Sequence, residues 1–403
     1  MSSPSLCLYQ LPPELLQQIL HRLPRSSLAQ LCLTAQRFYE LCLPKLYRHL
    51  NLSFRSHIHQ LEMGLQHRPL LRDTVARHTK ELTLVCRQSG SNMSDLTKLL
   101  PKLPHVHTLT FVDFHVLFTE SVCQLALYCR HLQTLQFRYC NLVSTTHNIH
   151  ALLASPLKRV NRLSMVWTDF SETALSQLLS CLPDLTTIDL GANHNRIRTA
   201  NDSALTALTQ HCFHIRNLAV SLQHIEQESL CDVLAFYGNQ FLSIRCGSSP
   251  RILGTVATFC SHVVHLSLRA AGRQRQKSHA LEHVLRQCTR LRWLELSGWL
   301  IQDIPSVVWS VIARKRRLGC SSSHSAAAAD GSGSRSHGNN SSSSSSSSAG
   351  DRMVDNGDWQ YYLDDAAMLQ QRSGDIQYRQ VGNLKKTLIL DSQELYEIRN
   401  RLA

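Results

Sequence analysis

A short apolar pattern, Leu-x-x-Leu-x-Leu, recurs along residues 79–296 and constrains the fold more than any other feature of the chain. It reads LQTLQF from Leu132, LTTIDL from Leu185 and LRWLEL from Leu291, and six looser copies lie between Thr79 and Leu268. The central apolar positions are 22 to 30 residues apart: Leu82, Leu109, Leu135, Leu163, Ile188, Leu218, Ile244, Leu266 and Leu294. This period fits one short strand and one returning helix per unit. A single unit cannot close its own core, so the units must stack, which predicts an α/β solenoid.

The segments between the apolar patterns have the features of helices and tight corners. Residues 171–182 and 202–212 carry apolar side chains three and four apart, with Ser171 and Asp202 as the expected N-caps. Cysteines recur three or four residues before the pattern, at positions 129, 181, 212, 260 and 288. A small, nearly apolar side chain suits a helix-to-strand corner. Equivalent residues lie one strand apart and no C-x-x-C occurs, so we expect no metal site. The spacing resembles the cysteine-containing class of leucine-rich repeats.

Ahead of the repeats, residues 11–47 predict three short helices. Pro12 and Pro13 favour a helix start, and Glu14 suits its positive end. The apolar side chains that follow cover an arc of about 140°: Leu15, Leu16, Ile19, Leu20 and Leu23. Helices this short enclose little core by themselves. The segment therefore either caps the first repeat or buries its leucines in a partner.

The residues of this segment resemble an F-box over about residues 8–50. The matching positions are Leu11-Pro12-x-Glu14-Leu15-Leu16-x-x-Ile19-Leu20-x-x-Leu23, Leu28, Arg37-Phe38 and Leu46-Tyr47-Arg48. Two positions depart from the family pattern, because Leu20 stands where Phe is frequent and Thr34 where Val is common. The resemblance implies binding to the SKP adaptor protein of a cullin-RING ubiquitin ligase. The implied contacts are Leu11, Pro12, Glu14, Leu15, Ile19, Leu20 and Phe38.

The expected organisation is an F-box (8–50), a helical connector (51–78), a leucine-rich-repeat solenoid (79–318), an insertion (319–357) and a terminal capping repeat (358–403). The insertion holds AAAA, Gly-Ser alternation and eight consecutive serines, a composition that predicts disorder. Residues 358–371 predict a helix, and residues 385–398 predict a strand with Leu388 and Leu390 followed by a closing helix. The fold class is therefore α/β: a short three-helix F-box followed by a curved solenoid with one strand and one helix per repeat.

Composition excludes several classes of function. No run of eighteen apolar residues and no signal-peptide pattern occur, so we expect neither a membrane span nor secretion. Fourteen cysteines without a short disulfide framework predict free thiols and a cytoplasmic or nuclear location. The net charge is +13, and the basic residues are spread through the repeats. Their densest run, Arg314 to Arg317, fits a nuclear localisation signal or a nucleic-acid patch. A solvated helix end is the simpler interpretation of the run. We expect no nucleic-acid partner.

One string matches a catalytic motif. His279-Ala280-Leu281-Glu282-His283 fits the H-x-x-E-H pattern of a zinc protease. However, it lies in a helix between two strands, where Leu281 and Leu285 should face the core and turn both histidines to solvent. We expect no enzyme, no metal and no cofactor.

The remaining candidate site is the inner strand face of the solenoid. Its charges are mixed, and it does not cluster arginines as a reader of phosphorylated motifs would. Trp293 is the best candidate anchor, and the expected target-binding residues are Arg245, His265, Trp293 and Glu295. We predict the substrate-recognition subunit of an SKP-cullin-F-box ubiquitin ligase, with cullin reached through the adaptor. The alternative is a repeat scaffold without a ligase role.

Overall fold

The structure is a computed structural model that describes residues 11–53, 56–86, 94–144, 156–191, 198–222, 224–270, 277–299, 303–312 and 387–403. All of these residues belong to one compact unit. The Ser/Gly/Ala-rich insertion, the helix expected at 358–371 and the basic run from Arg314 lie outside the described residues. Within the described ranges, no helix is long and apolar enough to cross a membrane.

Three helices precede the repeats, as the sequence predicts. They are α1 (Pro13–Arg22), α2 (Arg25–Cys32) and α3 (Gln36–Arg48). Pro13 lies in the first turn of α1, and Pro24 is the N-cap of α2, so each proline marks a helix start.

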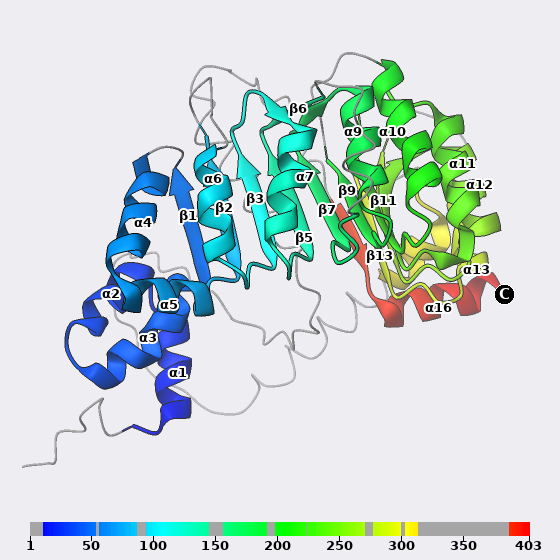
Figure 1. The fold of residues 1–403 in the computed structure, drawn as a ribbon. Coiled ribbons are helices and arrows are strands. Elements are labelled where there is room, and N and C mark those ends of the chain that lie inside the picture. The colour runs from blue at the N-terminus through cyan, green and yellow to red at the C-terminus, as the bar shows by residue number, and fades with distance from the viewer. Residues whose placement is uncertain are drawn as a thin grey trace, which may run out of the picture. The chain divides into compact units, whose positions relative to one another are not determined.

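The repeats form one large sheet (Figure 1). Within the described residues its strands are, in sheet order, β1 (His49–Ser53), β2 (Glu81–Val85), β3 (Thr108–Val112), β5 (Thr134–Arg138), β7 (Arg162–Val166), β9 (Thr187–Leu190), β10 (Asn217–Val220), β11 (Ser243–Ser248), β12 (His265–Ala270), β13 (Trp293–Ser297) and β14 (Thr387–Leu390). Every pairing from β1 to β13 is parallel. A second, small sheet joins β4 (Leu117–Phe118), β6 (Asn141–Val143) and β8 (Asp169–Phe170).

Helices cover one face of the large sheet (Figure 1). They are α4 (Ser56–His67), α5 (Pro69–His78), α6 (Ser94–Leu99), the 3-10 turn η2 (Leu100–Lys102), α7 (Thr119–Tyr128), α9 (Glu172–Ser180), α10 (Arg198–His211), α11 (Gln227–Tyr237), the 3-10 turn η3 (Gly238–Gln240), α12 (Pro250–Phe259), α13 (Lys277–Gln287) and α16 (Ser392–Leu402). From α9 onward each helix contacts the next, up to α13 against α16. The face of the sheet without these helices is called the open strand face below.

The predicted apolar anchors align across the sheet. Leu82 pairs with Leu109, Leu218 with Ile244, and Leu266 with Leu294, each in parallel register. All nine anchors are buried, on the side that packs against the helices. The predicted fold class, three helices followed by stacked strand–helix repeats, is therefore confirmed.

The sheet begins one strand earlier than the sequence predicts, and its last strand, expected from Leu388 and Leu390, is antiparallel to its neighbour. Within the segment 49–53, Leu50 pairs with Leu82 and Leu52 with Leu84, so β1 begins the sheet where a helical connector was expected. At the other end β14 pairs with β13 antiparallel, so the last unit is not a copy of the preceding repeats. Its helix α16 carries a capping box between Asp391 and Glu394.

Of the two predicted N-caps, one is right and one is wrong. Ser171 accepts a hydrogen bond from the Ala174 amide at 3.2 Å and caps α9. Asp202 lies inside α10, which begins at Arg198. Its carboxylate instead accepts a hydrogen bond from the Glu226 amide at 2.9 Å, which joins α10 to the start of α11.

The corner cysteines are buried free thiols, and three of them bond to the preceding repeat. The Sγ atom of Cys212 is 3.5 Å from the Leu182 carbonyl oxygen, that of Cys260 is 3.6 Å from Leu234, and that of Cys288 is 3.7 Å from Cys260. Burial raises the pKa of Cys129, Cys212, Cys260 and Cys288 to about 12. These thiols stay protonated at neutral pH, which suits a structural role rather than metal binding.

Tyr237 joins two repeats through its hydroxyl group. The side chain is buried, and its oxygen lies 2.9 Å from the Leu208 carbonyl oxygen and 2.5 Å from that of Cys212. The hydroxyl donates one hydrogen to this pair of acceptors. It thereby supplies a donor to the Cys212 carbonyl just after the end of α10, whereas the Leu208 carbonyl also accepts from the Cys212 amide at 3.0 Å.

Replacing Tyr237 by Phe should lower the free energy of unfolding by about 1–3 kcal/mol, because the Cys212 carbonyl loses its side-chain donor. Tyr128→Phe is the matched control, since that side chain is exposed. Urea unfolding followed by circular dichroism measures both. Equal midpoints for the two variants would contradict the role given to the Tyr237 hydroxyl.

Candidate functional site

The three amino-terminal helices have a small core of their own and also pack on the first repeat. Leu20, Leu28 and Cys42 form that core. Helix α3 contacts α5 and β1, and the Lys80 amide donates to the Arg48 carbonyl at 2.8 Å. The capping role considered from the sequence is therefore physically present.

Two polar contacts fix α1 against α3. Arg37 Nη2 donates to the Leu11 carbonyl at 3.1 Å, and Lys45 Nζ donates to the Gln17 carbonyl at 2.8 Å. The two contacts join residues that are 26 and 28 positions apart in the sequence. Together they set which face of α1 turns inward.

Helix α1 carries apolar side chains on two faces. Leu16 and Leu20 are buried, whereas Leu15 and Ile19 are 45% and 37% exposed. Leu15 and Ile19 are four residues apart, so they adjoin on the helix surface. Pro12 and Glu14 are exposed beside them, and Leu11 is partly exposed. No described residue of the chain covers the face formed by Leu15 and Ile19.

Two of the residues expected to contact an adaptor are instead buried in the chain. Leu20 is only 1% exposed, and Phe38 is also buried. A side chain that already fills a core has no surface to offer a partner in this conformation. Leu20 is part of the small core of the three helices and Phe38 is buried within the chain, so the available contacts are Leu11, Pro12, Glu14, Leu15 and Ile19.

The sequence did not indicate two further exposed apolar side chains of these helices. Leu33 is 88% exposed in the turn after α2, and Tyr39 is 46% exposed on α3. Leu33 lies outside the helical spacing that predicts a buried face. Tyr39 adjoins the buried Phe38 in sequence, and adjacent residues on a helix point in different directions.

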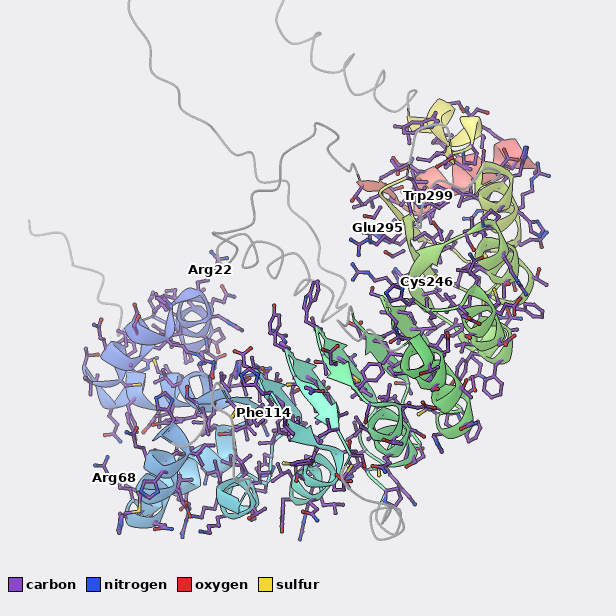
Figure 2. All side chains as sticks on the ribbon, turned by 90° about the horizontal axis from the view of Figure 1, so that it is seen from above. Arg22, Arg68, Phe114, Cys246, Glu295 and Trp299 are labelled. Atoms are coloured by element: carbon purple, nitrogen blue, oxygen red, sulfur yellow. The ribbon has the colours of Figure 1, made fainter. Side chains whose placement is uncertain are left out.

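The predicted target residues share the open strand face. Ser267 pairs with Glu295 and His265 with Trp293 across β12 and β13, while Arg245 pairs with Ser267. Trp293 is 41% exposed, and Figure 2 shows Glu295 on the side of β13 away from the helices. The Ser267 hydroxyl donates to Glu295 Oε2 at 3.0 Å. The structure therefore brings the four residues together on three neighbouring strands.

A fifth exposed side chain, which was not predicted from the sequence, adds an apolar contact beside these four residues. Ile389 of β14 is opposite Glu295 and is 48% exposed. The alternation of Leu388 and Leu390 could have indicated it, because the residue between them must face the other side of the strand.

Burial shifts the titration of two groups on this face. It raises the pKa of the Asp189 carboxyl to about 7, and the positive charge of Arg245 opposes the shift. These residues are two strands apart in register, with the small Ala219 between them. At His265, burial and then the charge of Arg292 lower the pKa, so this imidazole stays neutral at neutral pH.

The zinc-protease string lies as predicted on α13. Leu281 and Leu285 are buried, while His279 and His283 are exposed. In the described part of the chain, no three His, Cys, Asp or Glu side chains converge so that they could hold a metal ion.

Among known protein families, one model matches this chain, and the match lies at its amino-terminal end. Residues 8–53 match the model of F-box-like domains. No curated protein matches the chain significantly. The chain is similar to a structure described as the Rad7 and Elc1 complex in yeast, with 13% identity over 70% of this chain and 79% of that chain and a TM-score of 0.35. It is also similar to the leucine-rich repeat-containing protein LegL7 from Legionella pneumophila, with 13% identity over 70% of this chain and 87% of that one and a TM-score of 0.34.

Asp189 gives the open strand face a measurable pH dependence. Its pKa is raised from the ordinary value of 3.8 to about 7, so the folded chain binds a proton that the unfolded chain has already released. The free energy of unfolding should therefore fall as the pH rises from about 4 to about 7. Asp189→Asn should flatten this fall, whereas Asp184→Asn, at an exposed position, should not. Parallel stability–pH curves for the wild type and Asp189→Asn would show that this carboxyl is not perturbed.

Proposed function

We propose that this chain is the substrate-recognition subunit of an SKP-cullin-F-box ubiquitin ligase. The F-box-like match at residues 8–53 supports this assignment, and so does the apolar surface formed by Leu15 and Ile19. The second of these carries the proposal. A helix that only caps a repeat needs one apolar face, and α1 has two.

The adaptor would cover the exposed face of α1. Leu15 and Ile19 supply the apolar contact, with Leu11, Pro12 and Glu14 at its edge. Leu20 acts indirectly, by fixing the orientation of α1 from within the helical core, and Phe38 is buried on α3. Leu33 and Tyr39 are additional exposed apolar side chains of the three helices and are further candidates for partner contact.

The repeats would hold the protein target on the open strand face. Trp293 is the proposed anchor, with His265, Arg245 and Glu295 around it and Ile389 on the neighbouring strand. Exposed aromatic side chains commonly dominate the binding energy of an interface. The chain itself would supply no reacting group, and its effect on transfer of ubiquitin would be proximity. We also assign the repeats to the cysteine-containing class of leucine-rich repeats, because the buried cysteines recur at the corners. The free thiols favour a location in the cytoplasm or nucleus.

A scaffold without a ligase role is the second candidate. The contacts of α3 with α5 and β1 favour it, because they give the amino-terminal helices a capping function without any partner. The two candidates differ in whether a purified SKP adaptor binds the exposed face of α1.

Ile19→Asp should abolish adaptor binding and leave the fold intact. The aspartate is hydrated in the free chain, since Ile19 lies at the surface, but the adaptor would bury it without a counter-charge at a cost of several kcal/mol. Leu127→Asp, at an exposed position of α7, is the matched control. Titration with purified adaptor measures binding, and circular dichroism checks the fold. Undiminished binding of Ile19→Asp would defeat the ligase proposal.

Trp293→Ala should weaken target association by about 2 kcal/mol or more, because it removes the proposed anchor. Phe213→Ala serves as the control, since Phe213 is exposed in a helix-to-strand corner rather than on the open strand face. Pull-downs from cells with the proteasome inhibited compare the two variants, with adaptor recovery as the internal reference. Retention of every target by Trp293→Ala would place recognition elsewhere on the chain.

A further inference from the structure

Four successive helix-to-strand corners lie side by side at one edge of the large sheet. They are residues 77–80, 104–107, 130–133 and 158–161, each directly before β2, β3, β5 or β7. The His107 amide donates to the Lys80 carbonyl at 2.7 Å, Gln133 to His107 at 2.8 Å and Asn161 to Gln133 at 2.9 Å. Backbone bonding therefore continues the strand register through the corners, at a spacing of about 4.8 Å per repeat. We call these four segments together the basic corner.

The basic corner has one sign of charge. Its four segments contain no Asp or Glu. They do contain five cationic side chains and four histidines: Arg77, Lys80, Arg130, Lys158, Arg159, His78, His105, His107 and His131. The next corner, residues 183–186, brings in Asp184, so the row of positive charge ends there.

The repeat geometry brings these groups into contact with one another. The rings of His105 and His131 stack with centroids 5.5 Å apart, and those of His107 and His131 are 6.0 Å apart. Arg159 Nη1 donates to the Arg130 carbonyl at 2.9 Å and lies 3.5 Å from Nδ1 of His131. Because successive repeats stack, side chains at equivalent corner positions lie next to one another and form a row of imidazole and guanidinium groups.

No counter-charge from the described part of the chain neutralises this row. Among the described residues, none of its five cations forms an ion pair with a carboxylate. Glu81, at the start of β2, lies 3.9 Å from Arg48 and 3.7 Å from His49 instead. Burial lowers the pKa of His105, and the charges of Lys80, His131 and His107 lower it further. The row therefore carries repulsion that anionic oxygens would relieve.

We propose that the basic corner binds an acidic segment of a partner polypeptide, through carboxylate or phosphate oxygens. The sixteen residues of the four segments include no Phe, Tyr or Trp. A single-stranded nucleic acid would therefore find only histidine and arginine side chains to stack on among them. The exposed Leu127 and Tyr128 at the end of α7 offer an apolar contact beside the row, which a mixed acidic and apolar peptide would use. This surface is separate from the open strand face and from α1, so the inference stands whether or not the adaptor binds.

The test is fluorescence anisotropy of the full chain with a labelled peptide of alternating glutamate and serine. A second peptide carries phosphoserine in place of glutamate and separates the two sources of anionic oxygen. A third carries glutamine and should not bind. Binding of the glutamate peptide should strengthen as the pH falls well below 6.5, because the lowered pKa of His105 means that its ring gains charge only there. The phosphoserine peptide is compared at constant pH, because its phosphate takes up a proton near pH 6.

The double variant Arg130→Glu with Lys158→Glu should weaken binding roughly tenfold or more, because two attractive contacts become repulsive. The control, Arg286→Glu with Arg290→Glu, changes the net charge equally at exposed positions near the other end of the sheet and should retain binding. If the charge-reversed variant fails to fold by circular dichroism, the neutral variant Arg130→Gln with Lys158→Gln replaces it and should still weaken binding.

Equal losses in both double variants would show that only net charge matters and would overturn the proposal. Tighter binding of single-stranded RNA, or of vesicles containing phosphatidylserine, with the same dependence on Arg130 and Lys158, would also overturn it, because the ligand would then not be a polypeptide.

Discussion

The structure depends on one interaction, the in-register contact of buried aliphatic anchors from strand to strand. Leu109 packs between Leu82 and Leu135 in the same row of the sheet, and this relation holds along the parallel strands up to Leu294. A parallel pair needs a crossover connection, which here is the helix of each repeat. The row of anchors therefore sets the strand register, the helix positions and the corners together. The open strand face and the basic corner are rows of residues at fixed offsets from these anchors.

The same periodicity explains which features could be predicted from the sequence. The nine anchors, the buried cysteines and the exposed histidines of α13 follow from repeat spacing and helical periodicity alone. Strand β1 was missed because Leu50 and Leu52 lie where the F-box pattern (8–50) meets the expected helical connector (51–78). The antiparallel direction of β14 could not be predicted, since alternation in a strand is the same in both directions.

Local signals failed where tertiary contacts compete with them. Asp202 has the residue type of an N-cap, but α10 starts four residues earlier and the carboxylate bonds to the next helix instead. Leu20 and Phe38 match interface positions of a family pattern, yet both are buried, and Leu20 belongs to the small core of the three helices. The basic corner was not predicted as a charge cluster, because its four segments are more than twenty residues apart in sequence. They lie side by side only because the repeats stack.

The central claim is that α1 presents a second apolar face to a partner while the solenoid stays unchanged. Hydrogen exchange of the full chain, alone and with purified SKP adaptor, tests it most directly. The account predicts slower exchange in residues 11–48 on addition of the adaptor and no change in strands β9 to β13. Absence of protection in α1, or protection confined to the repeats, would contradict it.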